Sequence, residues 1–363
     1  MKIIRHGDAE TVMSNSGSRH NYFGWPTVTR LKNGRIAAVS SGYRLGHVCP
    51  FGKAVISYSD DGGNTYTAPA PVIDTVLDDR DGGIMTFGKS GVIVTSFNNT
   101  IEFQKNYCQY TPATAEYRKA YLALLTPEEE ARDLGSTFKI SYDNGVTFSQ
   151  LYKSPVTSPH GPCELDDGTV LWVGTVYGSK DSCDSSIQAW SINTENGEMT
   201  KVGDIPEVKD QGKAFPCEPH AICLGNGKLI CHIRVCGEGI DGSNVFTTYQ
   251  SVSEDYGRTW TQPRMLLEVE GGAPAHILCH SSGALISVYG YRLAPFGIKA
   301  MFSFDGGETW DTGHDIYVNG VNLDLGYPSS IELDDGSILT VFYAHRQSGE
   351  PATVLSQKWS FER

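Results

Sequence analysis

The sequence predicts an all-β protein that folds as a six-bladed β-propeller, with a short helical insertion in the second blade. Three observations support this. A turn pattern of the form Ser-x-Asp-x-Gly-x-Thr-aromatic occurs four times, a glycine-centred hairpin pattern occurs six times, and one stretch has a helical period. Because the repeats run through the whole chain, residues 1–363 are expected to form one domain.

The first pattern has the composition of a tight turn between two strands. Its copies begin at Ser59, Ser141, Ser253 and Ser303. The Asp caps backbone amides of its own turn, the Gly supplies a positive φ, and the aromatic residue plugs into the core. The residue types therefore indicate a structural role, without catalytic weight.

The second pattern is an apolar run, a turn with glycine and another apolar run, which is typical of a β-hairpin. The turn glycines are Gly34, Gly91, Gly168, Gly227, Gly283 and Gly336. Most steps between them are on the order of 55 residues, a period typical of propeller blades. Six hairpins predict six blades, and residues near Met1 are expected to complete the last blade and hide both edges.

One stretch departs from these repeats. Residues 114–130 are helical in period, and Thr126-Pro127 can open a second helical turn. The stretch lies between the second and third strands expected for blade two. A long insertion in a compact fold is often a lid or a binding loop.

Charge and composition exclude several classes of partner. The chain has 29 basic and 42 acidic residues, a net charge of −13, which disfavours nucleic acid and anionic membranes. No segment has the length of a membrane span, and no apolar run follows Met1, so a cytoplasmic location is expected. No metal-ligand spacing or phosphate loop is present, so no cofactor is expected. The oligomeric state is not indicated.

The propeller topology predicts which side chains share a face. Residues just before the first strand of a blade, or just after the second, lie opposite the hairpin turns. This face collects five arginines with histidine, carboxylate and tyrosine side chains: Arg44, Arg80, Arg234, Arg292, Arg346, His47, His160, Asp79, Glu218 and Tyr327. Arginine forks bind carboxylates in a bidentate way, so the set indicates an anionic ligand, although each arginine could instead pair with a local carboxylate.

At these residues the chain resembles the sialidase superfamily, in which the Ser-x-Asp turn is called the Asp-box. In that family an arginine triad holds the sugar carboxylate, a tyrosine activated by a glutamate attacks the anomeric carbon, and an aspartate is the acid/base. Residues 217–234 are similar to the family segment that carries the glutamate and one arginine, which implies Glu218 and Arg234. Tyr291-Arg292 resembles the next triad arginine, and residues 326–330 resemble the nucleophile segment, which implies Tyr327.

Two positions depart from the family pattern. Gly24-Trp25-Pro26 stands where the family has Arg-x-Pro, so the first triad arginine is absent, and Arg19 or Arg44 could replace it. Residues 42–50 contain no carboxylate for the acid/base role, only His47. The candidates for the proton donor are therefore His47, Asp79, Asp81 and His160.

The expected function is that of a glycoside hydrolase acting on an acidic sugar. It would be an exo-glycosidase, and exo-α-sialidase is one candidate activity. Glu218 and Tyr327 would form the nucleophile pair, and the arginines and His160 would bind substrate. Two alternatives remain open on the sequence. The same residues suit a polysaccharide lyase acting on uronate-containing glycans, and they suit a propeller that binds glycans without catalysis.

Overall fold

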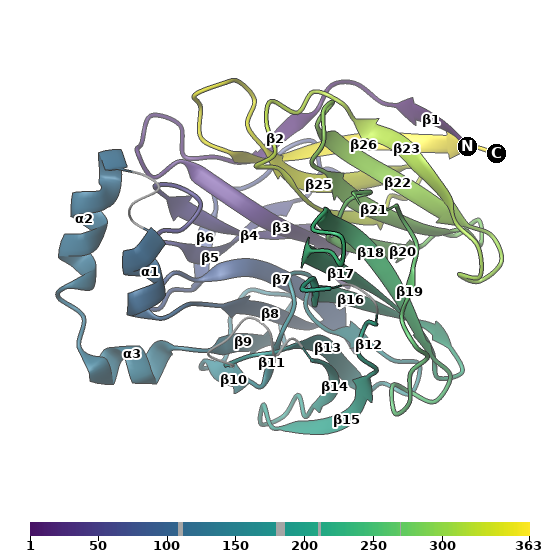
Figure 1. The fold of residues 1–363 in the computed structure, drawn as a ribbon, viewed down its shortest axis with the longest axis horizontal. Coiled ribbons are helices and arrows are strands. Elements are labelled where there is room, and N and C mark those ends of the chain that lie inside the picture. The colour runs from purple at the N-terminus through teal and green to yellow at the C-terminus, as the bar shows by residue number, and fades with distance from the viewer. Residues whose placement is uncertain (108–111, 179–185, 210–211, 269) are drawn as a thin grey trace.

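Six antiparallel sheets arranged in a ring make up the fold in the computed structural model, which describes residues 1–107, 112–178, 186–209, 212–268 and 270–363 (Figure 1). Each sheet has four or five strands, and the paired strands run antiparallel. The predicted six-bladed propeller is confirmed.

Blades one to three cover the first half of the chain. Blade one contains β3 Tyr22–Arg30, β4 Ile36–Arg44, β5 Lys53–Ser59 and β6 Ala70–Ile73. Blade two contains β7 Arg80–Phe87, β8 Gly91–Phe97, β9 Ser136–Ser141 and β10 Tyr152–Ser154. Blade three contains β11 Val156–Thr157, β12 Cys163–Glu164, β13 Val170–Val176, β14 Ile187–Ile192 and β15 Met199–Ile205.

Blades four to six complete the ring. Blade four contains β16 Phe215–Gly225, β17 Lys228–Glu238, β18 Asn244–Ser253 and β19 Arg264–Met265. Blade five contains β20 Ala275–Cys279, β21 Leu285–Tyr291, β22 Gly297–Ser303 and β23 Asp311–Tyr317. Blade six contains β24 Gly326–Glu332, β25 Ile338–Ala344 and β26 Thr353–Glu362, with β1 Lys2–Arg5 and β2 Glu10–Met13 at its outer edge.

Both ends of the chain meet in blade six, as the sequence predicts. β26 pairs antiparallel with β25 on one side and with β1 and β2 on the other, so that Lys2 lies opposite Glu362. The two termini are neighbours in Figure 1. This pairing covers the open edge of β26.

The Asp-boxes lie beside the hairpin turns, on what we call the turn face. In blade one, Ile36 after the Gly34 turn pairs with Ser59, the first residue of an Asp-box. In all four copies the serine hydroxyl donates to the aspartate at 2.7–2.9 Å, and the threonine hydroxyl donates to the same carboxylate at 2.6–2.7 Å. The aromatic residues of the turns pack against core clusters: Tyr66, Phe148, Trp260 and Trp310.

The helical insertion lies between β8 and β9 of blade two. It contains α1 Ile101–Tyr107, α2 Pro112–Leu122 and α3 Pro127–Asp133, with a capping box at Thr126, and residues 108–111 lie outside the described residues. The helices project beside the ring at the left of Figure 1. Arg118 donates to the Val48 carbonyl at 2.9 Å and Tyr121 packs on Phe51, so α2 contacts the loop after β4.

A repeated irregularity occurs in the innermost strand of four blades. Trp25, Asp81, Glu218 and Tyr327 have φ values of 55°, 48°, 49° and 49°, and the pairing register shifts at each of them. Such bulges re-aim a side chain relative to the strand. Positive φ is strained for residues with a Cβ, and clusters of such residues occur at functional sites.

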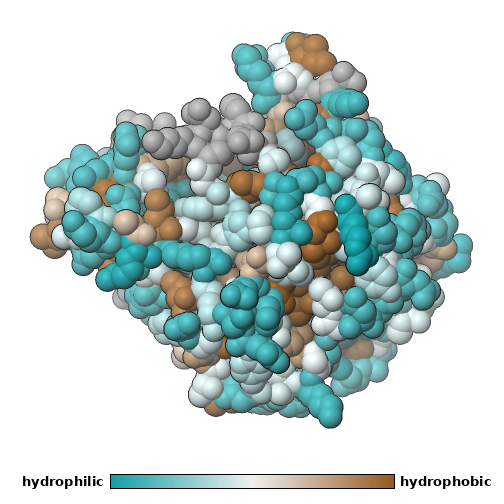
Figure 2. Space-filling model, turned by 90° about the horizontal axis from the view of Figure 1, so that it is seen from below, coloured by the Kyte–Doolittle hydropathy of each residue, from teal (hydrophilic) through white to brown (hydrophobic). Residues whose placement is uncertain are grey.

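The surface agrees with the acidic, polar composition. Most of the face seen in Figure 2 is hydrophilic, and hydrophobic side chains gather in a hollowed strip near its centre. Among the described residues no helix is long and apolar enough to cross a membrane.

Candidate active site

Glu218 and Tyr327 meet on the face opposite the turns, which we call the site face. The Tyr327 hydroxyl donates to Glu218 Oε1 at 2.6 Å, although the residues are 109 positions apart. Burial, reinforced by the charge of Glu218, raises the pKa of Tyr327 well above its usual value. The phenol is therefore held neutral, with a carboxylate placed to accept its proton.

Arg234 and Arg292 flank this pair, as the sequence predicts. Arg234 Nη1 donates to Glu218 Oε2 at 2.6 Å and to the Tyr327 hydroxyl at 3.1 Å. The Arg292 guanidinium lies 5.7 Å from the centroid of the Tyr327 ring. Both guanidinium groups lie over Phe246, at 5.0 and 5.2 Å from its centroid. The two cations thus share one aromatic platform, which sequence reasoning missed because Phe246 lies on β18, outside the strand ends considered.

Trp25 lies next to Gly24, the position at which the resemblance implies a third arginine. Its side chain is 1% exposed, and the guanidinium of Arg80 stacks on it at 4.3 Å from the ring centroid. The Trp25 ring also contacts Tyr327, with centroids 6.4 Å apart. Blade one lacks an arginine beside Tyr327. Arg80 of blade two therefore supplies a cation at this place.

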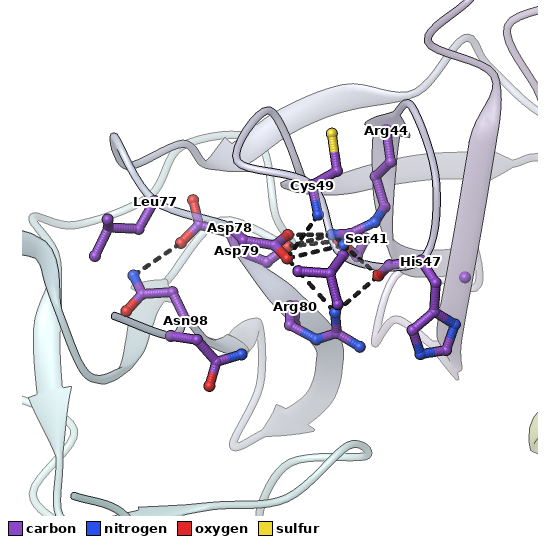
Figure 3. Close-up of polar contacts among 12 residues, drawn as sticks. Ser41, Arg44, His47, Cys49, Leu77, Asp78, Asp79, Arg80 and Asn98 are labelled. Carbon is purple, nitrogen blue, oxygen red and sulfur yellow. Dashed lines mark hydrogen bonds and ion pairs between the residues drawn. The ribbon is translucent and has the colours of Figure 1, made fainter. Parts of the chain in front are cut away.

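Arg44 does not lie on the open rim, which corrects its predicted placement. The residue is fully buried, and its guanidinium binds both oxygens of Asp78 at 2.5 and 3.0 Å (Figure 3). Arg80 contacts the same carboxylate at 3.5 Å. Asp78 thus offsets much of this positive charge, and Arg44 supports the site from beneath.

Asp79 is also turned away from the site face. Its carboxylate accepts from the Thr75 amide at 2.7 Å and from the Thr75 hydroxyl at 2.9 Å. It also accepts from Asn98 at 3.4 Å (Figure 3). The next residue but one, Asp81, is 5% exposed and lines a cavity of about 170 Å³ together with Glu218. Of the two aspartates, only Asp81 lines a cavity together with Glu218, the partner of Tyr327.

His160 lies in a buried histidine cluster and away from solvent, which corrects its predicted place on the open rim. It contacts His220 and His276, with ring centroids 5.4 and 5.0 Å apart, and its Nδ1 lies 3.1 Å from the Thr27 hydroxyl. Burial lowers the pKa of all three imidazoles, that of His220 to about 3. The cluster is therefore a neutral packing feature between the inner strands.

His47 remains at the site face, with half of its side chain exposed. Its Nδ1 lies 3.0 Å from Asp324, which also accepts from Tyr22 at 2.9 Å and from Tyr343 at 3.1 Å and contacts His345 at 3.0 Å. The sequence places Asp324 three residues before Tyr327, but the two tyrosines that complete this network carry no sequence signal. Arg346 is exposed and donates to the Ala9 carbonyl at the edge of blade six.

The site and fold together define a sialidase-like propeller, and comparisons with known proteins agree. Residues 123–340 match the family model described as BNR repeat-like domain, so the chain belongs to that family. No curated protein sequence matches the chain.

Solved structures share the fold at low sequence identity. A protein of unknown function from Dyadobacter fermentans is similar with a TM-score of 0.77 and 17% identity, over 99% of both chains. The NanB sialidase of Streptococcus pneumoniae has a TM-score of 0.66 and 12% identity over 97% of this chain and 70% of that one. An α-L-arabinofuranosidase of Fusarium graminearum has a TM-score of 0.65 and 12% identity over 98% of both chains. These likenesses show the fold alone.

Proposed function

We propose that this protein is a glycoside hydrolase that removes a terminal acidic sugar, with Tyr327 as nucleophile and Glu218 as its base. The observation that supports this most directly is the 2.6 Å hydrogen bond from Tyr327 to Glu218 beside two arginines. A phenol is a weak nucleophile at neutral pH, because its ordinary pKa is about 10. A carboxylate that takes the proton as the bond forms removes this obstacle.

A neutral nucleophile also suits an anionic substrate. A carboxylate nucleophile would repel a substrate carboxylate, whereas the Tyr–Glu pair keeps the negative charge on Glu218, where Arg234 neutralises it. Arg292 carries no carboxylate partner among the described residues and lies beside the reacting phenol. We assign Arg292 to the substrate carboxylate, with Arg234 and Arg80 adding positive potential around it.

The second candidate is hydrolysis of a neutral sugar, and the absence of an arginine at Gly24 favours it. A glycine in place of an arginine removes one ligand for a substrate carboxylate. The fungal α-L-arabinofuranosidase shows that an enzyme with this fold can act on such a sugar. In this reading Arg292 would bind hydroxyl groups.

A panel of aryl glycosides tests the proposal. The purified protein is assayed with 4-methylumbelliferyl α-N-acetylneuraminide, β-glucuronide, α-galacturonide and α-L-arabinofuranoside. Cleavage of an acidic sugar by the wild type, its loss in Tyr327→Phe and its retention in the rim variant Tyr291→Phe would support the proposal. Cleavage of the arabinofuranoside alone would support the second candidate.

The panel is combined with two further measurements. A fluorinated analogue of the cleaved sugar should label Tyr327, which peptide mass spectrometry detects. Uronate-containing polysaccharides that yield unsaturated products would identify a lyase. Binding without any product would identify a glycan-binding propeller, and either result would overturn the proposed hydrolase.

A further inference from the structure

Asp81 is a buried acid that lines the same cavity as Glu218. It lies in β7 at one of the four positive-φ bulges, at φ 48°, which places it like Glu218 and Tyr327 in their blades. The cavity of about 170 Å³ is otherwise lined mainly by small polar or apolar groups: Phe97, Thr157, Ser158, Pro159, Thr175 and Cys217. A space of this size next to a nucleophile pair can admit part of a sugar or its leaving group.

One oxygen of this carboxyl group is unused by the protein. Asp81 Oδ1 is buried and has no hydrogen-bond partner among the described residues. Its neighbour Asp79 accepts three hydrogen bonds from Thr75 and Asn98. A buried oxygen without a partner costs free energy, on the order of 1–3 kcal/mol, unless a ligand satisfies it. The contrast separates a structural aspartate from one that is open to a ligand.

The surroundings of Asp81 shift its pKa in opposite directions. Burial raises the pKa of Asp81 above its usual range, Arg80 acts against this, and Glu218 adds to it. Arg44 and Arg234 also favour the anion, but Asp78 and Glu218 occupy these two arginines. Tyr327, a further titratable neighbour, is neutral. Asp81 can therefore hold a proton near neutral pH, whereas Glu218 is bound by the Arg234 guanidinium at 2.6 Å. Two neighbouring carboxyl groups in such different surroundings can divide the roles of acid and base in glycoside hydrolysis.

We propose that Asp81 is the general acid/base of the reaction, supplied by blade two in place of the carboxylate that blade one lacks. This role rests on the proposed function. In the first step Tyr327 Oη bonds to the anomeric carbon and its proton passes to Glu218. The bond to the leaving oxygen breaks, and Asp81 protonates that oxygen. In the second step Asp81 takes a proton from water and the water oxygen bonds to the anomeric carbon. The bond from that carbon to Tyr327 Oη breaks, and Glu218 returns the proton to Tyr327 Oη.

Leaving-group dependence tests this assignment. The phenyl and 4-nitrophenyl glycosides of the acidic sugar that the wild type cleaves are compared in Asp81→Asn. Loss of a general acid lowers rates by about 10²–10⁴-fold, and we expect this loss for the phenyl glycoside, which needs protonation. For the 4-nitrophenyl glycoside, whose leaving group needs little protonation, the first step should be far less affected, and added azide should accelerate turnover.

The control variant is Asp79→Asn, which changes a buried aspartate of the same strand entry that has no place in the cavity. It should lower the midpoint of thermal unfolding and leave the ratio of the two glycosides unchanged. If Asp81→Asn does not fold, carbon-13 spectra of aspartate-labelled wild type and Glu218→Gln replace it. A carboxyl group protonated at neutral pH that becomes more acidic in Glu218→Gln supports the assignment.

The contradicting outcomes are distinct. If the wild type cleaves no acidic sugar, the proposed function fails and this role fails with it. If the wild type cleaves one and Asp81→Asn loses both glycosides equally, or neither, only the assignment of Asp81 is overturned. Spectra in which every aspartate is ionised at neutral pH also overturn it.

Discussion

The turn face and the site face use aspartate in opposite ways. On the turn face each Asp-box carboxylate is bound by the serine and threonine of its own turn, and hydrogen bonds from Thr147 lower the pKa of Asp143 to about 2. On the site face Asp81 has an oxygen without a partner, and Asp324 gathers groups from three separate segments. The aspartates that repeat the same local hydrogen bonds lie in structural turns. The aspartates without this pattern lie at the candidate site.

The inner strands teach the same lesson within one face. Four blades carry a positive-φ bulge at the same place, yet the residues there are Trp25, Asp81, Glu218 and Tyr327. The backbone conformation is the same in the four blades, but the side chains at this position differ in chemistry. A propeller can therefore keep its core while four side chains around one axis are chosen for a substrate.

The largest expected effect is on activity, at the site face. Glu218→Gln should lower kcat by at least about 100-fold, because Tyr327 loses the group that accepts its proton. The change is measured on the glycoside that the wild type cleaves, with circular dichroism to confirm folding. A Glu218→Gln protein with wild-type activity would contradict the catalytic role of Glu218 and, with it, the functional difference between the two faces.

A smaller effect is expected from Arg292→Ala, which removes a cation without removing the nucleophile. A charge-assisted hydrogen bond contributes about 1.5–3 kcal/mol, so the affinity for the acidic product should fall about 10–150-fold. Isothermal titration with the free sugar measures this. Unchanged affinity for the acidic sugar, with weaker affinity for a neutral one, would favour the neutral-sugar candidate.

The histidine cluster between the two faces predicts a pH dependence of stability. The pKa of His220 is about 3 in the folded protein and about 6.5 in the unfolded chain. The unfolded chain therefore binds more protons below pH 6.5, so the stabilising contribution is complete above that pH and is lost as pH falls toward 3. His220→Asn, which can still accept from the Ile277 amide, should flatten this dependence in thermal unfolding. An unchanged slope between pH 6.5 and 4 would contradict it.

The smallest effect is expected on the turn face. Ser141→Ala removes a buried hydroxyl that donates to Asp143 and accepts from the Gly145 amide at 2.9 Å. Leaving that amide without a partner should cost on the order of 1–2 kcal/mol in the free energy of unfolding. Urea denaturation measures the loss, and kcat should remain that of the wild type. A loss of activity without a loss of stability would show that the Asp-box does more than close a turn.

The sequence predicts those features whose interacting residues are close together along the chain. The hairpins and Asp-boxes form from residues a few positions apart, so their patterns predict the blades. Glu218 and Tyr327 could be brought together because both precede the hairpin of their blade. Arg44 could not be placed, because its partner Asp78 is 34 residues away and buried with it. Asp79 and Asp81 look alike in sequence. In the structure Asp79 is bound by Thr75 and Asn98, whereas Asp81 lies at a bulge and lines the cavity.

The closure of blade six sets an order for folding during synthesis. β1 and β26 pair residues 360 positions apart, so β1 has no partner until β26 has left the ribosome. At typical rates of translation this wait lasts on the order of tens of seconds. During that time the first strand is an open edge, and its charged side chains, Lys2 and Arg5, suit a strand that must avoid pairing with other chains. The pairing of β1 with β26 is therefore a late step of assembly, and the ring of the propeller closes only after β26 has been synthesised.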